Sequence, residues 1–360
     1  MAPHAFMIPD ALADDPQSLT SAEGAGETDR VAGGPRSFRL VPLVARGCTG
    51  PCPEGGRHRG RTVVTSLRAL CELALAGPPR AIAAAWPHDE DVLVSLDRAA
   101  SAGLVRPLLV GRRSVIEPLC ARIGLTRPPG EIVDCESDAE AIETAIRRVG
   151  GGEAQMLMKG LVSTSAFLKG ILNKEWGLRK RALISHVAVF ECREPDRLVL
   201  LTDVAINIAP DVAAKAQIVE NAVEVANRLG IERPRVAALA AVETVSADMA
   251  ATIDAAVLAK MADRGQIKGC ILDGPLALDN ALSAEAARHK GITSPVAGCA
   301  DILLAPDLEA GNVLYKALSV VARVPLAAVV VGASAPIVLT SRADSDETKF
   351  NSIALAAAIS

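Results

Sequence analysis

The fold class is decided by residues 106–160, RPLLVGRRSVIEPLCARIGLTRPPGEIVDCESDAEAIETAIRRVGGGEAQMLMKG. Short apolar runs alternate here with longer segments that have the apolar spacing of a helix. The runs are 106–111, 131–135 and 154–160, and the helical segments are 114–125, starting at Ser114, and 138–150. Continuously apolar strands separated by helices are typical of parallel sheets that are buried on both faces. The stretch therefore predicts an α/β fold with a parallel sheet.

The same alternation continues on both sides of this stretch. Residues 66–75 have a helical pattern, 182–191 and 197–204 are apolar runs, and 213–230 form a long helical pattern. A chain of 360 residues exceeds the usual size of one domain. We therefore expect two α/β units in one chain.

Composition narrows the class of protein. Residues 1–60 hold nine Gly and seven Pro, which predicts a flexible, low-complexity extension. The net charge of -4 offers no basic footprint for nucleic acid, and no apolar run is long enough to span a membrane. The eight cysteines lack the dense spacing of a disulfide scaffold, and no zinc site is completed. We expect a cytoplasmic protein without a metal and without nucleic-acid or membrane partners.

Candidate binding residues follow the strand at 154–160. In open α/β sheets, ligands bind beyond the carboxyl ends of the strands. A helix that begins at Ser163 or Thr164 would point its free N–H groups at an anion, and nearby lysines would add positive charge. The alternative is an ordinary capped helix with solvated lysines. The candidates for substrate binding are Lys159, Gly160, Ser163, Thr164 and Lys169.

Three further junctions carry polar residues that a turn does not require. Asp203 and Asn207 follow one apolar strand, Asp273 and Gly274 end another, and Asn312 precedes a helical pattern. Each is a candidate for substrate binding. Each also has a simpler explanation, since Asp and Gly are turn formers and Asn312 can cap the helix.

The segment PIVLTSRADSDETKFNSIALA, residues 336–356, places a dense charge run directly after an apolar strand. Ser341 and Arg342 come where this strand leaves the sheet, and a guanidinium beside a hydroxyl suits phosphate or pyrophosphate. Asp346, Glu347 and Lys349 also fit a solvated charge run that opens the last helix. That simpler explanation accounts less well for the Ser-Arg pair.

In order and spacing, six motifs resemble the phosphate acetyltransferase and phosphate butyryltransferase family. They are MKGLVSTSAFLKGIL (158–172), SHVAVFE (185–191), LLTDVAINIAPD (200–211), DGPLALDNAL (273–282), SPVAGCADILLAPDLEAGN (294–312) and PIVLTSRADSDETKFNSIALA (336–356). The resemblance covers the chain from about residue 61 to its end. It implies a reversible transfer of a short acyl group between coenzyme A and inorganic phosphate.

The resemblance also implies an architecture. The family has a two-domain, parallel-sheet-rich fold similar to isocitrate and isopropylmalate dehydrogenases, with the site in the cleft between the domains. Its C-terminal segment closes the first domain, which here gives 61–178 plus 325–360 as the first domain and 179–324 as the second. Family members form homodimers and use coenzyme A as a substrate, with no permanently bound cofactor.

Roles in the site follow from the same resemblance. The Ser-Arg pair of the family falls on Ser341 and Arg342, and a basic residue on the first helix falls on Lys169. Acetyl-specific members carry an Asp as proposed base, but that spacing lands here on Thr348. We therefore assign the acid to Asp346, with its neighbours Asp344 and Glu347 as alternatives. This departure favours the butyryl-type branch.

Two rival functions differ in class. An NAD-dependent dehydrogenase of the same fold would need a metal site, which Asp203, Asp273 and Asp279 could imitate, but no GxGxxG follows a strand. A non-catalytic protein that binds coenzyme A is the other rival, and the unusual N-terminus keeps it open. Turnover of any acyl-CoA with phosphate separates the expected enzyme from both.

Overall fold

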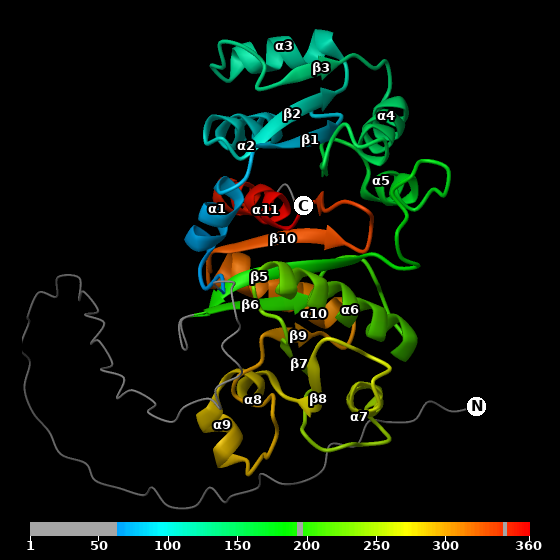
Figure 1. Ribbon diagram of the computed structural model, residues 1–360, viewed down its shortest axis with the longest axis vertical. Helices are drawn as coiled ribbons and strands as arrows, with labels where there is room; N and C mark the ends of the chain where they lie inside the picture. The colour runs from blue at the N-terminus through cyan, green and yellow to red at the C-terminus, as the bar shows by residue number, and fades with distance from the viewer. Residues whose placement is uncertain (1–62, 193–196, 341–343) are drawn as a thin grey trace, which may run out of the picture. The chain divides into compact units, whose positions relative to one another are not determined.

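The computed structural model describes residues 63–192, 197–340 and 344–360. The strands in this part of the chain form one sheet in the order β3-β2-β1-β4-β11-β10-β5-β6-β9-β7-β8 (Figure 1). The strands are β1 (Arg80–Ala85), β2 (Val105–Val110), β3 (Glu131–Val133), β4 (Met156–Lys159), β5 (Ser185–Cys192), β6 (Arg197–Thr202), β7 (Arg235–Leu239), β8 (Ile271–Leu276), β9 (Ile302–Leu304), β10 (Leu326–Val331) and β11 (Ile337–Val338).

The helices alternate with these strands along most of the described chain. They are α1 (Leu67–Leu75), α2 (Glu90–Ser101), α3 (Arg113–Arg122), α4 (Asp138–Gly150), α5 (Thr164–Ile171), α6 (Val212–Arg228), α7 (Ala250–Asp263), α8 (Leu278–Leu282), α9 (Ala284–His289), α10 (Leu308–Lys316), the π-helical turn η1 (Ala317–Val321) and α11 (Asp346–Ile359). The alternation predicted for 106–160 is confirmed, although α3 begins one residue before Ser114.

Parallel pairing dominates the sheet, as predicted. β3, β2, β1, β4 and β11 are mutually parallel, and so are β6, β9, β7 and β8. Three pairings in the middle are antiparallel, namely β11 with β10, β10 with β5, and β5 with β6. Connection length explains the first and the third of these pairings. Only a few residues join β5 to β6 and β10 to β11, and short connections produce antiparallel neighbours.

Helices cover both faces of the sheet, as the apolar strands predict. One face packs against α1, α2, α3, α6, α7 and α11. The opposite face carries two separate clusters, one beneath α4 and α5 and one beneath α8 and α10. Along β5 the first of these clusters ends at Ile184 and the second begins at Ala188. His186 lies between them, so a polar residue occupies the boundary between two apolar clusters.

The last helix, α11, is buried along almost its whole length. It packs against β10, α1 and α2. The solvated explanation for its charges is wrong for Lys349, which is 3% exposed and whose ammonium lies 2.8 Å from the Asp91 carboxylate of α2. Glu347 accepts a hydrogen bond of 2.9 Å from Arg98, also on α2. The charge run therefore anchors α11 to α2.

Other predictions concern the organisation of the whole chain. The division at residues 178/179 and 324/325, and the cleft between two domains, stay predictions. The extension predicted at 1–60 lies outside the described residues. In the part of the chain that the structure describes, no helix combines the length and apolar composition needed to cross a membrane.

Gly160 gives a test of how tightly the first strands are packed. A methyl group on its Cα would lie 2.3 Å from the Trp86 carbonyl oxygen and 2.6 Å from that of Ala85. Because both neighbours are backbone atoms, Gly160→Ala should lower the free energy of unfolding by about 1–3 kcal/mol. The urea midpoint of the purified variant measures this. Gly77→Ala, whose methyl group would approach nothing closer than 3.9 Å, is the matched control and should change little. Equal midpoints for the two variants would contradict the close approach.

Candidate functional site

The junction after β4 has the predicted local structure. Ser163 caps α5, because its Oγ accepts a hydrogen bond of 3.1 Å from the Ala166 N–H. Ser163 and Thr164 are exposed, and the Lys159 side chain turns back to donate to the Gly160 carbonyl oxygen at 3.2 Å. Lys169 lies in the last turn of α5, about 9 Å along the helix from its cap. The junction thus joins four of the five candidates, and Lys169 belongs to the far end of the helix.

Asp203 organises the loop that follows β6. It is 3% exposed. Its Oδ1 accepts backbone N–H groups of His186, Ala205 and Ile206 at 3.2, 2.9 and 3.2 Å, and its Oδ2 accepts the backbone and side-chain N–H groups of Asn207. Five donors saturate the carboxylate. Asp203 therefore acts as a loop-forming residue, which was the simpler of its two explanations.

Helix α10 packs against this loop through two neighbouring residues. A methyl group at Gly311 would lie 2.1 Å from the Asp203 carbonyl oxygen, so only glycine allows the approach. Asn312 donates from Nδ2 to the Val204 carbonyl oxygen at 3.0 Å. Asn312 is not the cap of α10, since Asp307 caps it. The structure thus brings Asp203, Asn207 and Asn312 together, as a site at strand ends requires.

A buried polar cluster lies beside this loop, and we call it the Asp344 cluster. The Asp344 side chain is 4% exposed and lies 3.4 Å from the Lys316 ammonium of α10. Tyr315, also buried, shares a hydrogen bond with Asp344, and burial with this nearby carboxylate raises the pKa of the Tyr315 phenol. The cluster also includes His186 of β5. The charges of Asp344 and Lys316 act on the pKa of its imidazole.

His186 is the feature of this cluster that packing alone does not explain. The residue is 5% exposed, and neither ring nitrogen makes a hydrogen bond to the described residues. Burial lowers the pKa of the imidazole, while the Asp203 and Asp344 carboxylates act in the opposite direction. Buried polar atoms are almost always hydrogen-bonded in folded proteins. A neutral imidazole without partners therefore indicates a place where a ligand can supply them.

The structure describes one of the three predicted catalytic residues. Ser341 and Arg342 lie outside the described residues. On the side before them, Leu339 packs against the cluster beneath α4 and α5, and Ile206 of the Asp203 loop packs against the same cluster. Asp346 is in the first turn of α11, and its side chain is 68% exposed. Of the acidic residues in this segment, Asp344 is the one that the structure buries among other polar groups.

Asp273 and Gly274 lie on β8, and no contact joins them to the other candidates among the described residues. Asp273 accepts a hydrogen bond of 2.9 Å from the N–H of Gly274. Farther on, Asp279 forms an ion pair with Lys290. The described part of the chain contains no group of three or more His, Cys, Asp or Glu side chains arranged to hold a metal ion.

Sequence reasoning overlooked three members of the Asp344 cluster. His186 sits inside an otherwise apolar strand, and a lone polar residue at such a position is the signal that could have revealed it. Tyr315 and Lys316 read as ordinary residues of an amphipathic helix. Their importance depends on α10 packing beside β6, which no local pattern encodes.

Comparison with known proteins agrees with this fold. A model of the phosphate acetyl/butaryl transferase family matches residues 138–357, which include every predicted site residue. A phosphate butyryltransferase of Clostridium beijerinckii is 50% identical over 282 residues, covering 78% of this chain and 93% of that protein. A phosphate acetyltransferase of Thermotoga maritima is 43% identical over 291 residues, covering 81% of this chain and 98% of that protein.

A solved structure shares the fold. The branched-chain phosphotransacylase of Enterococcus faecalis superposes with a TM-score of 0.70 and 33% identity, covering 78% of this chain and 98% of that one. The fold and the site define an α/β protein of the phosphate acyltransferase class. The chain belongs to the phosphate acetyl/butaryl transferase family.

The buried imidazole of His186 predicts a dependence of stability on pH. Because burial lowers its pKa, the unfolded chain binds a proton below about pH 6.5 that the folded protein does not. Stability conferred by the neutral ring is therefore present above that pH and is lost as the pH falls toward the folded pKa. His186→Gln should show a weaker fall, by up to about 1.4 kcal/mol per pH unit.

Urea unfolding of both proteins between pH 5 and 8 measures this difference. His88 also has a lowered pKa, but both proteins contain it, so its effect cancels in the comparison. Parallel stability curves would show that His186 does not titrate differently in the folded and unfolded states.

Proposed function

We propose that this protein catalyses the reversible transfer of a short acyl group between coenzyme A and inorganic phosphate, in a cleft between the two domains predicted from the sequence. Butyryl-type substrates are favoured over acetyl-type ones. Membership of the phosphate acetyl/butaryl transferase family supports the reaction. The higher identity to the butyryltransferase of C. beijerinckii than to the acetyltransferase of T. maritima supports the longer chain.

The observation that carries the proposal is the buried Asp344 cluster with the unpartnered imidazole of His186. Asp344 is two residues after Arg342 in the sequence, and the strand before the Ser341-Arg342 pair, β11, runs parallel to β4. Because parallel strands end at the same edge of a sheet, the β4 junction with Lys159 and Ser163 lies beside the end of β11. Reactive anions and a thiol need such a concentration of donors and charges.

In the direction that forms the acyl phosphate, a phosphate oxygen attacks the thioester carbonyl carbon. The new C–O bond forms, the C–S bond breaks, and the thiolate of coenzyme A leaves. We assign Arg342 to holding phosphate and Ser341 to donating a hydrogen bond to the carbonyl oxygen, where negative charge builds. Lys159, Ser163 and the N-terminus of α5 add to the binding of anionic groups. No covalent enzyme intermediate is required, so a ternary complex is expected.

The reverse direction needs a base for the thiol of coenzyme A. Asp346 is the sequence-based prediction, but its side chain faces solvent. The geometry favours Asp344, which is buried between Lys316 and Tyr315, close to His186. We propose Asp344 for this role, with His186 receiving its hydrogen-bond partner when substrate binds.

Three accompanying properties belong to the same proposal. The protein uses coenzyme A as a substrate, without a permanently bound cofactor. It acts as a homodimer, and it works in the cytoplasm. The use of coenzyme A and the homodimer follow from the family resemblance, and the cytoplasmic location follows from the dispersed cysteines.

Thiol release from a series of acyl-CoA esters in the presence of phosphate tests the proposed reaction. We expect butyryl-CoA to exceed acetyl-CoA in kcat/KM by at least about tenfold, since each methylene in a fitted pocket contributes a factor of about ten or more. Reduction of NAD⁺ by hydroxy acids is the parallel assay for the rival dehydrogenase. Absence of thiol release with every ester would overturn the proposal and leave a protein that only binds coenzyme A.

A pair of isosteric variants tests the choice of base. Asp344→Asn should lower kcat in the direction that consumes acyl phosphate by about a hundredfold or more, because general-base catalysis contributes factors of this size. Asp346→Asn should stay within about twofold of wild type, because solvent already surrounds its carboxylate. The opposite ranking in steady-state assays would return the role to Asp346. Circular dichroism of both variants checks that the fold is intact.

A further inference from the structure

The turn after β1 has a backbone conformation that an ordinary connection does not need. Trp86 has a φ of 54°, in the left-handed region that residues other than glycine rarely adopt. Three hydrogen bonds fix it there. Its N–H donates to Val110 at 2.7 Å, and its carbonyl oxygen accepts the N–H groups of His88 and Leu161, both at 2.8 Å. Left-handed backbone in a bulky residue persists where the surroundings enforce it, and such positions concentrate at functional sites.

This turn lies at a topological switch point of the sheet. β1 and β4 are neighbours and run parallel, but they feed helices on opposite faces. α2, which follows β1, packs on one face, and α5, which follows β4, packs on the other. The two segments that follow β1 and β4 therefore diverge at the carboxyl ends of these strands. In doubly wound α/β sheets, nucleotides bind at this position.

Three side chains at this point of divergence form an aromatic and cationic group. The rings of Trp86 and His88 have centroids 3.9 Å apart at an angle of 37°. The guanidinium carbon of Arg112, which follows β2, lies 5.8 Å from the Trp86 ring centroid. His88 accepts the Arg112 backbone N–H on Nε2 at 3.1 Å, so a neutral ring carries its hydrogen on Nδ1. A flat base can stack on such a platform, with a guanidinium at its edge.

Arg112 retains capacity to bind an anion. Its side chain is 43% exposed, although its Nε is buried and makes no hydrogen bond to the described residues. One terminal nitrogen donates to the Glu136 carbonyl oxygen, and the Glu136 carboxylate lies 3.7 Å from Nε. That carboxylate is 87% exposed, so it can swing into solvent when a stronger anion arrives. Arg113 is less available, because it pairs with Glu117 and donates to the Ile132 carbonyl oxygen.

We propose that Trp86, His88 and Arg112 bind the adenosine end of coenzyme A, with adenine against the aromatic rings and the ribose 3′-phosphate at Arg112. The inference rests on the proposed function, and it concerns residues that precede those matched by the family model. The order β2-β1-β4-β11 places Trp86 and His88 two strand spacings, and Arg112 three, from the strand that leads to Ser341, which is about 10–14 Å. The pantetheine arm of coenzyme A separates nucleotide and thiol, so one molecule reaches both places.

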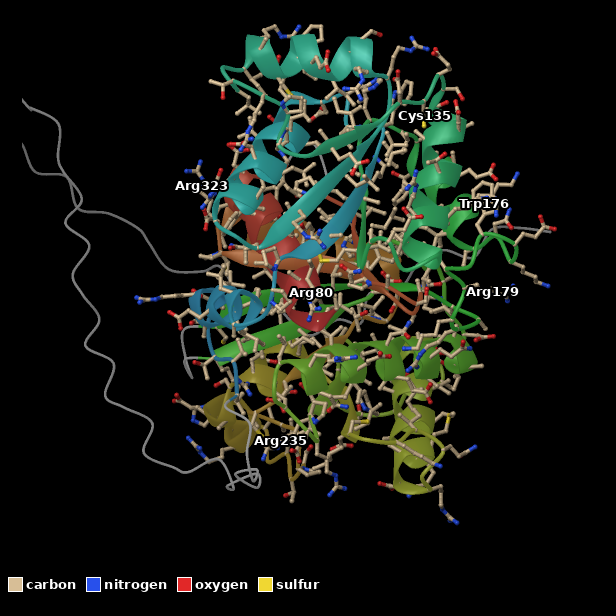
Figure 2. The ribbon with its side chains drawn as sticks, turned by 45° about the horizontal axis from the view of Figure 1, so that its top comes forward. Arg80, Cys135, Trp176, Arg179, Arg235 and Arg323 are labelled. Carbon is tan, nitrogen blue, oxygen red and sulfur yellow. The ribbon has the colours of Figure 1, made fainter. Side chains whose placement is uncertain are left out.

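Kinetics with paired substrates test this assignment. For Trp86→Leu we expect the KM for butyryl-CoA to rise about five- to a hundredfold, the range for loss of one stacked base. The kcat/KM for butyryl-pantetheine, which lacks the nucleotide, should stay within about twofold. Trp176→Leu, on the segment after α5 (Figure 2), is the matched control and should change neither. Equal losses with both substrates would overturn the proposal.

A second variant covers the case in which Trp86→Leu does not fold. Arg112→Gln removes a half-exposed charge. We expect it to weaken the binding of coenzyme A more than the binding of dephospho-coenzyme A, which lacks the 3′-phosphate. Isothermal titration of the folded variant with both ligands measures the difference. Equal weakening of the two, or none, would show that Arg112 does not contact this phosphate.

Direct binding also separates this inference from the proposed function. Adenosine 3′,5′-bisphosphate should bind wild type and bind Arg112→Gln at least about tenfold more weakly, whether or not any acyl-CoA turns over. If butyryl-CoA turns over but Arg112→Gln binds the bisphosphate as wild type does, the nucleotide site is wrong and the reaction stands. If the bisphosphate binds as expected but no ester reacts, the reaction is wrong and the site remains a nucleotide site.

Discussion

The insertion of the C-terminal segment into the middle of the sheet is the constraint on which the rest of the structure depends. β11 pairs with β4, which comes from the first half of the chain, and β10 pairs with β5, which comes from the second. Without this hairpin, the two halves would each present an unpaired sheet edge. The helix that follows, α11, is buried against α1, α2 and β10, so the same segment supplies both backbone pairing and apolar packing.

The position of the site follows from that insertion. On one face of the sheet, the apolar cluster beneath α4 and α5 and the apolar cluster beneath α8 and α10 are separate, and they meet at β5. His186 lies at the boundary, where neither cluster provides a polar partner. Asp203 accepts a hydrogen bond from the His186 backbone N–H, and the charge of Asp344 also acts on the His186 imidazole. A polar cluster can be buried there because its charges face one another across the boundary.

The two proposed ligand regions have different physical origins. The Asp344 cluster arises where elements distant in sequence pack together, and it is built from buried charges. The Trp86 region arises within one doubly wound unit, from the divergence of neighbouring strands, and it is partly exposed. A long substrate such as coenzyme A suits this combination, because its nucleotide and its thiol need different surroundings. The strand order sets the distance between them.

The sequence by itself determined the α/β class, the alternation in residues 106–160, and a cap of α5 at Ser163 or Thr164, because these depend on local periodicity and local hydrogen bonds. It also determined family membership through long motifs. Only the tertiary structure decided that Lys349 is buried against Asp91 and that the Asp203 carboxylate accepts hydrogen bonds from its own loop. It also decided that Asp344 rather than Asp346 lies among polar groups. Each of these depends on which segment packs beside another, and burial of a charge is set by neighbours that are far away in the chain.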